Sequence, residues 1–418
     1  MSWLRGAALL PLLLAAAPAA GSSADLFGLG SPAAGAAGAV VATADDYAAC
    51  FYNPAGLAAA DHPSLHLGWS AADARLRAGH RTVDLEHAGG FVLGFNLPFA
   101  LPLPWLPGLA FGLAVHAPPA VAVAIHARPP DEPAFPYFES RTARWLVLPA
   151  LALRLPAGWS VGAAVDLFAG IRGPFELREG PTGAVEGRAA FEMFTTAAPI
   201  VGLRWTPLET LALGLTWRAE FAAPAATVTS VDAAGAATRL TASLDGLFRP
   251  HTLTLGAAWT PHRARLELDL SWARWSAFHG AVADVAAELQ GVAIDPRELE
   301  LPFQDAFGLR LGGEYRFPLG LAAFTLRGGY AFESRILPAD APGAAQLDGD
   351  KHRLATGFGV ATTLDDTTDL RLDAHFAAEW VAGASALVPP DDPAAPPQHL
   401  EGAGVVLSTG ATLGVEWR

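Results

Sequence analysis

Residues able to do covalent chemistry are scattered along this chain and form no catalytic pattern. There is no Gly-x-Ser-x-Gly elbow, the turn that exposes a nucleophilic serine in many hydrolases. The twelve histidines form no His-x-x-x-His pair on a helix, and none is spaced with cysteine as metal ligands are. The single cysteine, Cys50, cannot form an internal disulfide, and we expect a buried thiol. We therefore predict no catalytic residues, no metal, no cofactor and no enzyme activity.

Charged side chains instead recur at every second position in several segments, where they could meet an anionic ligand. Arg265, Glu267 and Asp269 alternate with leucines, and similar segments follow later in the chain. An arginine that faces a cavity can bind a carboxylate, often with two hydrogen bonds. The candidates for such a head-group contact are Arg310, Arg327 and Arg371. The alternative is an internal ladder of ion pairs that only stiffens the protein.

The alternation itself predicts the elements that hold these side chains. A strand with lipid on one side and a lumen on the other needs apolar residues at every second position over roughly 9 to 11 residues. We predict an all-β protein, a 14-stranded antiparallel transmembrane β-barrel with an N-terminal hatch (plug) inside the lumen. The predicted strands are 64–76, 89–99, 109–127, 142–155, 159–172, 186–205, 209–222, 236–260, 263–275, 303–317, 321–334, 350–363, 367–381 and 403–418.

The connections between these strands alternate between short and long over most of the chain. The short ones contain Pro, Gly or Asp, and the long ones are rich in Pro, Gly and acidic residues. This asymmetry is typical of bacterial outer-membrane barrels, and a soluble β-sandwich has shorter strands and no such difference between its ends. With both termini in the periplasm, Trp205, Trp259 and Trp417 fall at one membrane edge, as in an aromatic girdle.

The N-terminal region divides into a leader and a hatch. Residues 1–20 have Arg5, an apolar stretch and a small-residue end, the pattern of a cleavable signal peptide. No later run of eighteen or more apolar residues occurs, so helical membrane spans are not expected. Residues 21–63 are rich in Gly and Ala, too short for a domain and too apolar for a solvated tail, which places them in the lumen of the barrel formed by 64–418. The net charge of −14 argues against a nucleic-acid partner.

A specific motif lies within the hatch. The run GAAGAVVATADD at 35–46 is followed by FYNPAGL at 51–57. Glycines let a backbone pack closely, and Asn-Pro sets a rigid turn. This opening resembles that of the FadL family of outer-membrane channels for long-chain fatty acids and other hydrophobic compounds. The hatch-motif residues are Asp45, Asp46, Asn53, Pro54, Ala55 and Gly56. Further likeness covers nearly the whole mature chain, although the family's Asp-Arg pair is here separated as Asp350 and Arg353.

The resemblance implies passive uptake of hydrophobic compounds, most of all long-chain fatty acids, through a hatch and a lateral opening at a kinked third strand. Pro118 and Pro119 are the candidate kink, since each lacks a ladder N–H, or they mark where the strand leaves the membrane. An apolar ligand pocket is expected at Phe51, Leu146, Leu148 and Phe168.

Capture at the outer surface would need exposed apolar side chains, and the candidates are Phe135, Tyr137, Phe138 and Phe278. A short amphipathic helix is expected around 281–290, either for capture or for packing on the barrel mouth. The partners are then outer-membrane lipid and hydrophobic small molecules such as fatty acids, with the protein a monomer. The alternative function is a FadL-like barrel that does not transport and acts as a scaffold or assembly factor in secretion.

Overall fold

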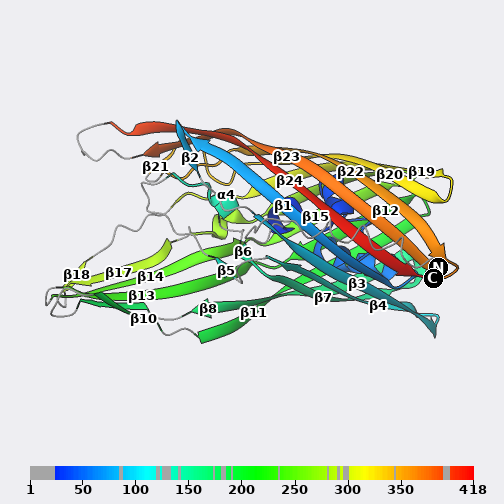
Figure 1. The fold of residues 1–418 in the computed structure, drawn as a ribbon, viewed down its shortest axis with the longest axis horizontal. Coiled ribbons are helices and arrows are strands. Elements are labelled where there is room, and N and C mark those ends of the chain that lie inside the picture. Colours follow the sequence, from blue (N-terminus) through cyan, green and yellow to red (C-terminus); the bar gives the residue numbers. More distant parts are fainter. Residues whose placement is uncertain are drawn as a thin grey trace, which may run out of the picture.

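The protein is a closed β-barrel in the computed structural model, which describes residues 24–83, 88–118, 123–124, 133–139, 143–172, 175–179, 185–189, 192–233, 236–279, 282–289, 292–294, 301–342, 345–388 and 396–418. Among these residues, fourteen antiparallel strands follow chain order around the ring, and β1 closes it by pairing with both β24 and β3 (Figure 1). The predicted fold class is confirmed. The barrel strands are β1 Ser64–Ala78, β3 Ala88–Leu103, β4 Leu106–Ala117, β7 Leu146–Arg154, β8 Trp159–Arg172, β11 Glu192–Leu208, β12 Leu211–Arg218, β15 Thr252–Trp259, β16 Ala264–Ala273, β19 Ala306–Leu319, β20 Ala322–Glu333, β22 Asp350–Asp365, β23 Thr368–Val388 and β24 Gln398–Trp417.

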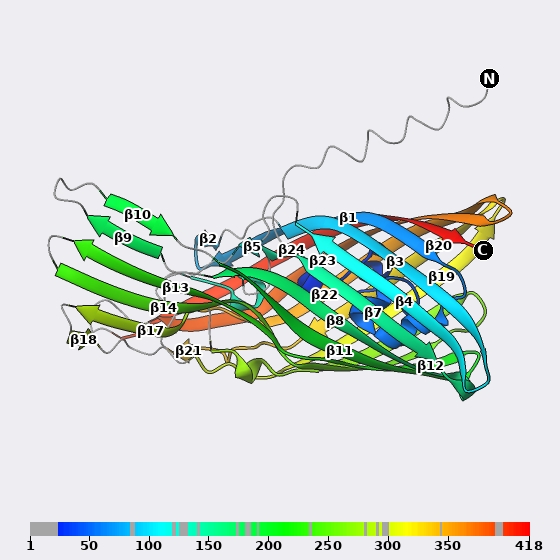
Figure 2. The same ribbon diagram turned by 90° about the horizontal axis from the view of Figure 1, so that it is seen from below.

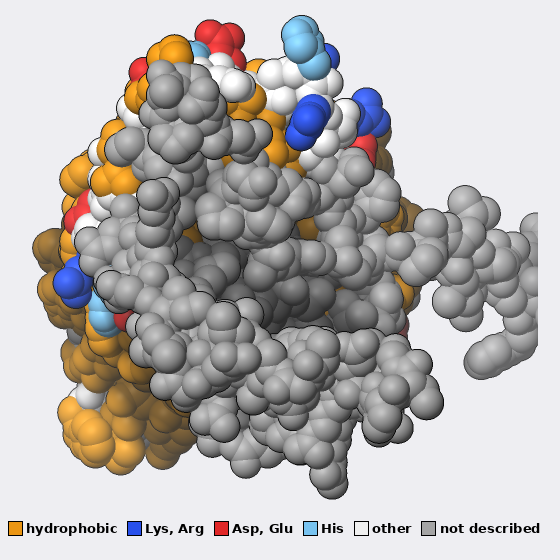
Figure 3. All heavy atoms as spheres, turned by 90° about the vertical axis from the view of Figure 1, so that its left-hand side faces the viewer, with side chains coloured by type: hydrophobic (Ala, Val, Ile, Leu, Met, Phe, Trp, Pro, Cys, Tyr) orange, Lys and Arg blue, Asp and Glu red, His pale blue; other side chains and the backbone are white. Residues whose placement is uncertain are grey.

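Alternation along the strands separates an apolar outer face from an inner face, which is polar on β16 and apolar on β7. On β16, Leu266 and Leu268 are 53% and 39% exposed, whereas Glu267 and Asp269 are 3% and 0% exposed. Successive side chains of a strand point to opposite faces, so this pattern gives the barrel a wall that lipid can cover. Seen from one end, hydrophobic side chains spread over the outer flank of the barrel (Figure 3).

The two ends of the barrel differ in their connections. At one end, here called the turn end, short turns join consecutive strands, and the C-terminus lies at the same end (Figures 1 and 2). The strands joined in this way are β3 and β4, β7 and β8 (through η3 Pro156–Gly158), β11 and β12, β15 and β16, β19 and β20, and β22 and β23. The long connections gather at the opposite end, here called the loop end. Trp205, Trp259 and Trp417 all lie near the turn end, as the strand assignment predicted. Trp205 also stacks on Trp159 with ring centroids 4.9 Å apart.

A second sheet extends beyond the loop end, in the order β10-β9-β13-β14-β17-β18 (Figure 1). Its strands are β9 Phe175–Glu179, β10 Val185–Ala189, β13 Phe221–Ala233, β14 Ala236–Arg249, β17 Val282–Leu289 and β18 Val292–Ile294. Two predicted strands are wrong in extent, because 236–260 divides into β14 and β15 and 186–205 divides into β10 and β11. The helix predicted around 281–290 is also wrong: β17 pairs with β14, and pairing to a neighbouring strand outweighs a weak helical periodicity.

The remaining long connections carry only short elements. These are β2 Arg81–Val83, β5 Val123–Ala124, α4 Pro136–Glu139, β6 Ala143–Arg144, η4 Trp275–Ala277 and β21 Ala341–Pro342.

The segment before β1 occupies the lumen (Figure 2). It contains α1 Ala24–Phe27, α2 Ser31–Gly35, α3 Ala49–Tyr52 and η2 Pro54–Ala59, and β1 begins directly afterwards at Ser64. The η2 turn packs on β7, β8 and β11, while α2 packs on β22 and β23 across the lumen. The signal peptide predicted at 1–20 lies outside the described residues. Among the described residues, no helix is long and apolar enough to cross a membrane.

Candidate functional site

The hatch motif is anchored to the wall through Asn53, which is fully buried. Its Nδ2 donates to the carbonyl oxygens of Val41 in the hatch (2.8 Å) and Leu203 on β11 (3.1 Å), and its Oδ1 accepts from the Ala55 N–H (3.2 Å). A Cβ at Gly202 on β11 would lie 2.0 Å from Asn53 Oδ1. Glycine at this wall position is therefore required for the motif to approach so closely.

The other predicted hatch-motif residues lie around this anchor. Pro54, Ala55 and Gly56 open η2, and a Cβ at Gly56 would come within 2.0 Å of the Ala44 carbonyl oxygen. Asp46 accepts the Ala48 N–H at 2.8 Å, and the Asp45 carbonyl accepts from Asn96 on β3 at 3.0 Å. The structure thus brings the motif together, and its part in transport stays a prediction.

A pair of buried carboxylates on β16 holds the loop between α2 and α3. Asp269 Oδ2 accepts the backbone N–H groups of Val40 (3.1 Å) and Val41 (3.3 Å). Glu267 accepts the Ala42 N–H at 2.6 Å and the Thr43 hydroxyl. The sequence placed both carboxylates in the lumen but gave no sign that the hatch backbone would be their partner.

Two of the three predicted head-group arginines belong to an ion-pair ladder. Arg327 Nη1 lies 2.8 Å from Asp373 Oδ1, and its Nε lies 3.1 Å from Glu314 Oε2. Arg371 Nε lies 2.7 Å from Asp373 Oδ2. For these two arginines the geometry agrees with the alternative, an internal ladder of ion pairs, because Glu314 on β19 and Asp373 on β23 already neutralise them, and their contact with a ligand stays a prediction.

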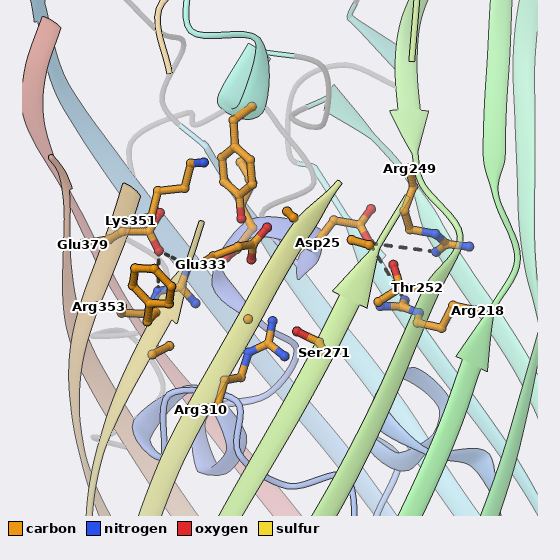
Figure 4. A pocket seen from close by; sticks show the side chains of 17 residues that line it. Asp25, Arg218, Arg249, Thr252, Ser271, Arg310, Glu333, Lys351, Arg353 and Glu379 are labelled. Atoms are coloured by element: carbon orange, nitrogen blue, oxygen red, sulfur yellow. Dashed lines mark hydrogen bonds and ion pairs between the residues drawn. The ribbon is translucent and has the colours of Figure 1, made fainter. Parts of the chain in front are cut away.

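Arg310, the third candidate, lines a cavity of about 90 Å³ between the hatch and the loop end (Figure 4). Within the described part of the chain, Arg310 forms no ion pair with an acidic side chain. Asp25 and Leu26 of the hatch line the same cavity, as does Tyr137 of α4. The hatch, the wall and a connection at the loop end therefore all contribute to its lining.

Cationic side chains dominate the lining of this cavity. They are Arg218, Arg249, Arg310, Lys351 and Arg353, against the acidic side chains Asp25, Glu333 and Glu379. Arg353 Nη2 lies 2.5 Å from Glu379 Oε2 and also donates to the Leu26 carbonyl. Lys351 Nζ lies 3.0 Å from Asp348 and 4.0 Å from the centroid of the Tyr137 ring. A cluster of this kind favours a ligand with a negatively charged group.

Sequence reasoning missed four of these cations. Lys351 and Arg353 alternate with outward residues at the loop end of a predicted strand, and Arg218 and Arg249 also lie close to strand ends. The sequence feature that could have identified them is a cationic residue at an inward position near the loop end of a strand. The sequence alone could not show that the ends of three separate strands, β12, β14 and β22, converge on one cavity.

The predicted outer-capture residues are buried instead of exposed. Phe135, Tyr137, Phe138 and Phe278 are at most 3% exposed, and they pack with Trp275 in one aromatic cluster at the loop end. Tyr137 and Trp275 have ring centroids 6.0 Å apart, and Phe278 lies 5.8 Å from Trp275. The expectation of exposure was wrong because connections distant in sequence cover one another. We call this group the aromatic lid.

The predicted apolar pocket is filled by the hatch. Leu146 and Leu148 of β7 are fully buried and belong to the same cluster as Phe51 and Leu57 of the hatch. The side chain of Phe168 lies outside the described residues. The surfaces that would hold an alkyl chain are therefore present, and hatch side chains cover them.

Pro118 does not interrupt a strand. It follows the last residue of β4, whose pairing is continuous to Ala117 with β3 and to His116 with β7, and Pro119 lies outside the described residues. The alternative, that the prolines mark the end of the strand, agrees with these bounds for Pro118.

A second cavity of about 350 Å³ lies on the other side of the hatch, at the turn end. Thr43 and Asp45 of the hatch line it together with Arg204, Arg265 and Glu314 of the wall. The hatch loop that Glu267 and Asp269 hold thus separates two polar cavities.

Comparison with known proteins gives a family match over residues 12–403, to the outer membrane protein transport proteins described as OMPP1/FadL/TodX. A FadL homologue from Pseudomonas aeruginosa superposes with a TM-score of 0.60 at 16% identity, covering 93% of this chain and 98% of that one. The monoaromatic hydrocarbon channel CymD gives 0.56 at 14% identity, with coverage of 93% and 98%. The toluene transporter TbuX of Ralstonia pickettii gives 0.52 at 14% identity, with coverage of 94% and 99%. Identities this low show the fold alone, and curated protein sequences give no match.

Proposed function

Because the chain belongs to the OMPP1/FadL/TodX family of outer membrane transport proteins, we propose that it takes up long-chain fatty acids, with their carboxylate bound in the cation-lined cavity. The turn end and both termini face the periplasm, and the loop end faces the outside. The compound enters past the aromatic lid, rests above the hatch and leaves sideways through the wall into the membrane. The protein works as a monomer.

The observation that carries this proposal is the charge of the cavity. Its lining has five cationic and three acidic side chains, and among the described residues Arg310 forms no ion pair within 4 Å. Arg249, Lys351 and Arg353 have acidic partners, so a neutral hydrocarbon would leave Arg310 above all without an opposite charge, which costs free energy. A carboxylate head group offsets that cost, and its alkyl chain can replace the hatch side chains on the apolar surface of β7. CymD and TbuX, by contrast, are described as a monoaromatic hydrocarbon channel and a toluene transporter.

The test compares binding of hexadecanoate and hexadecanol to the purified full-length protein by calorimetry. Hexadecanoate should bind more tightly, and Arg310→Gln should weaken only the acid, by roughly tenfold or more, the factor expected for a hydrogen bond to a charged group. Arg316→Gln is the matched control, because Arg316 is exposed at the turn end.

Equal binding of the acid and the alcohol, unaffected by Arg310→Gln, would contradict the fatty-acid assignment. The scaffold alternative predicts that vesicles carrying the protein take up neither compound. Uptake of labelled hexadecanoate above the rate of empty vesicles separates the two functions.

A further inference from the structure

The barrel wall contains a missing ladder bond between β7 and β8. The register runs from Val147 opposite Leu167 to Ala150 opposite Ala164, and the two pairs between them do not form bridges. The register is unchanged across the gap, so its cause is local: Pro149 has no N–H to donate to Val165, the residue opposite it. In a membrane wall, where no water replaces a lost partner, one such gap is a weak point.

A second proline lies one strand further along, at the same level of the wall. Pro199 on β11 lies opposite Val165 of β8. The carbonyl oxygen of Pro199 points away from β8 and accepts the Ala219 N–H at 2.9 Å. The reciprocal bond, from residue 199 to the Ala219 carbonyl, cannot form. The Arg249 guanidinium replaces it, with Nη2 donating to that carbonyl at 3.3 Å.

The same guanidinium reaches the first gap. Arg249 Nη1 lies 2.6 Å from Asp166 Oδ2, and Asp166 is the inward residue of β8 beside Val165. Both partners are buried. The Arg249 side chain therefore has two roles. It donates to the Ala219 carbonyl, which would otherwise accept from an N–H at position 199, and it holds β8 beside the hydrogen bond that is missing at Pro149.

Arg249 also lines the cation-rich cavity, where it lies 3.9 Å from Asp25 of the hatch (Figure 4). A carboxylate that enters this cavity competes for the guanidinium with Asp166 and with the Ala219 carbonyl. Ligand binding and closure of the wall thus depend on the same five donors of one side chain.

We propose that Arg249 is a clamp that keeps the wall closed around β8, and that an anionic head group in the cavity draws it away and lets the wall open at Pro149 and Pro199. This inference rests on the proposed function, and it names both the exit and its trigger. The exit lies against the apolar surface of Leu146 and Leu148, where an alkyl chain can pass directly toward lipid. It is a different place from Pro118, where the pairing of β4 is continuous.

The test restores the missing donors one at a time. Pro149→Ala and Pro199→Ala each return an N–H to the wall, and uptake of labelled hexadecanoate into vesicles should slow by about threefold to tenfold, the factor that one hydrogen bond carries. Binding of hexadecanoate should not change. Pro98→Ala is the matched control, because Pro98 is also in a wall strand, on β3, and does not line the cavity.

A variant with the opposite effect is Asp166→Asn, which keeps the side-chain shape, removes the charge that holds Arg249 and lies outside the cavity lining. It should speed uptake by about threefold or more. A purely structural role for these residues predicts slower uptake in Asp166→Asn and no loss of uptake when prolines are replaced.

The inference is overturned if Pro149→Ala and Pro199→Ala transport as fast as Pro98→Ala while the wild-type protein is active. If the wild-type protein neither binds nor takes up hexadecanoate, the proposed function fails and the clamp fails with it.

Discussion

Asn53 offers the sharpest test of how the hatch is held. Asn53→Ala removes three hydrogen bonds, of which only the one from Nδ2 to the Leu203 carbonyl joins the hatch to the wall, because Val41 and Ala55 belong to the hatch itself. At about 1 kcal/mol net for that bond, the attachment of the hatch should weaken by about 1 kcal/mol. That loss raises the fraction of molecules with a detached hatch by about fivefold.

Cys50 is a built-in reporter for this detachment. It is the only cysteine of the chain, lies in α3 and is fully buried. Burial raises the pKa of the Cys50 thiol, so little thiolate is present in the closed protein and a maleimide should react only through opened molecules. The rate of maleimide labelling in detergent at neutral pH should rise by about fivefold in Asn53→Ala.

The control is Thr362→Ala, which removes a hydrogen bond to the Leu321 carbonyl at the turn end without touching the hatch. Its labelling rate should equal that of the wild-type protein. The reasoning is refuted if Asn53→Ala keeps an intact barrel and labels at the wild-type rate, because Asn53 would then not anchor the hatch.

Three further predictions concern the carboxylate pair, an outer-loop acid and the aromatic lid. The double variant Glu267→Gln and Asp269→Asn weakens the hydrogen bonds from the wall to the hatch loop. The ion conductance of the protein in planar bilayers should therefore rise. An unchanged conductance would show that the two carboxylates only stiffen the wall. Burial raises the pKa of the Asp348 carboxyl above its ordinary 3.8. The folded protein therefore binds the carboxyl proton more tightly than the unfolded chain does. The stability that the protonated carboxyl contributes is lost as the pH rises through the raised pKa. The melting temperature of Asp348→Asn should therefore fall less than that of the wild-type protein when the pH is raised from about 4 to about 6; equal changes would count against this. Trp275→Ala should cost about 3 to 5 kcal/mol of packing in the aromatic lid, so proteolysis of the loop-end connections should increase while the barrel stays intact. Unchanged proteolysis would mean that other contacts hold the aromatic lid in place.

The barrel could be predicted from the sequence because its signal is repeated and local. Leucines at 266, 268 and 270 alternate with acidic residues, and lipid on one face with polar lumen on the other leaves only one register for such a strand. The same rule failed beyond the membrane. The strand at 282–289 belongs to the second sheet and not to the barrel wall, so the lipid-and-lumen rule does not apply to it and its pattern did not distinguish strand from helix.

The candidate site was only partly predictable, because it depends on which side chains meet. Arg310, Arg327 and Arg371 share the same inward pattern, yet the described residues give ion pairs to the last two and none to the first. Arg371 pairs with Asp373 two positions along its own strand, whereas the partners of Arg327, Glu314 and Asp373, come from other strands and follow only from how the strands are arranged. The burial of Phe135 and Phe278 has a similar cause, since the connections that cover them come from distant parts of the chain.

The central claim is that this barrel carries hydrophobic compounds across a membrane under the control of its hatch. Its most direct test is the uptake of labelled hexadecanoate by lipid vesicles that carry either the full-length protein or a variant lacking residues 28–60. The account predicts that the full-length protein takes up hexadecanoate saturably while it excludes a labelled sugar, and that the variant admits both. If vesicles with either protein take up hexadecanoate no faster than empty vesicles, the protein is not a transporter of such compounds.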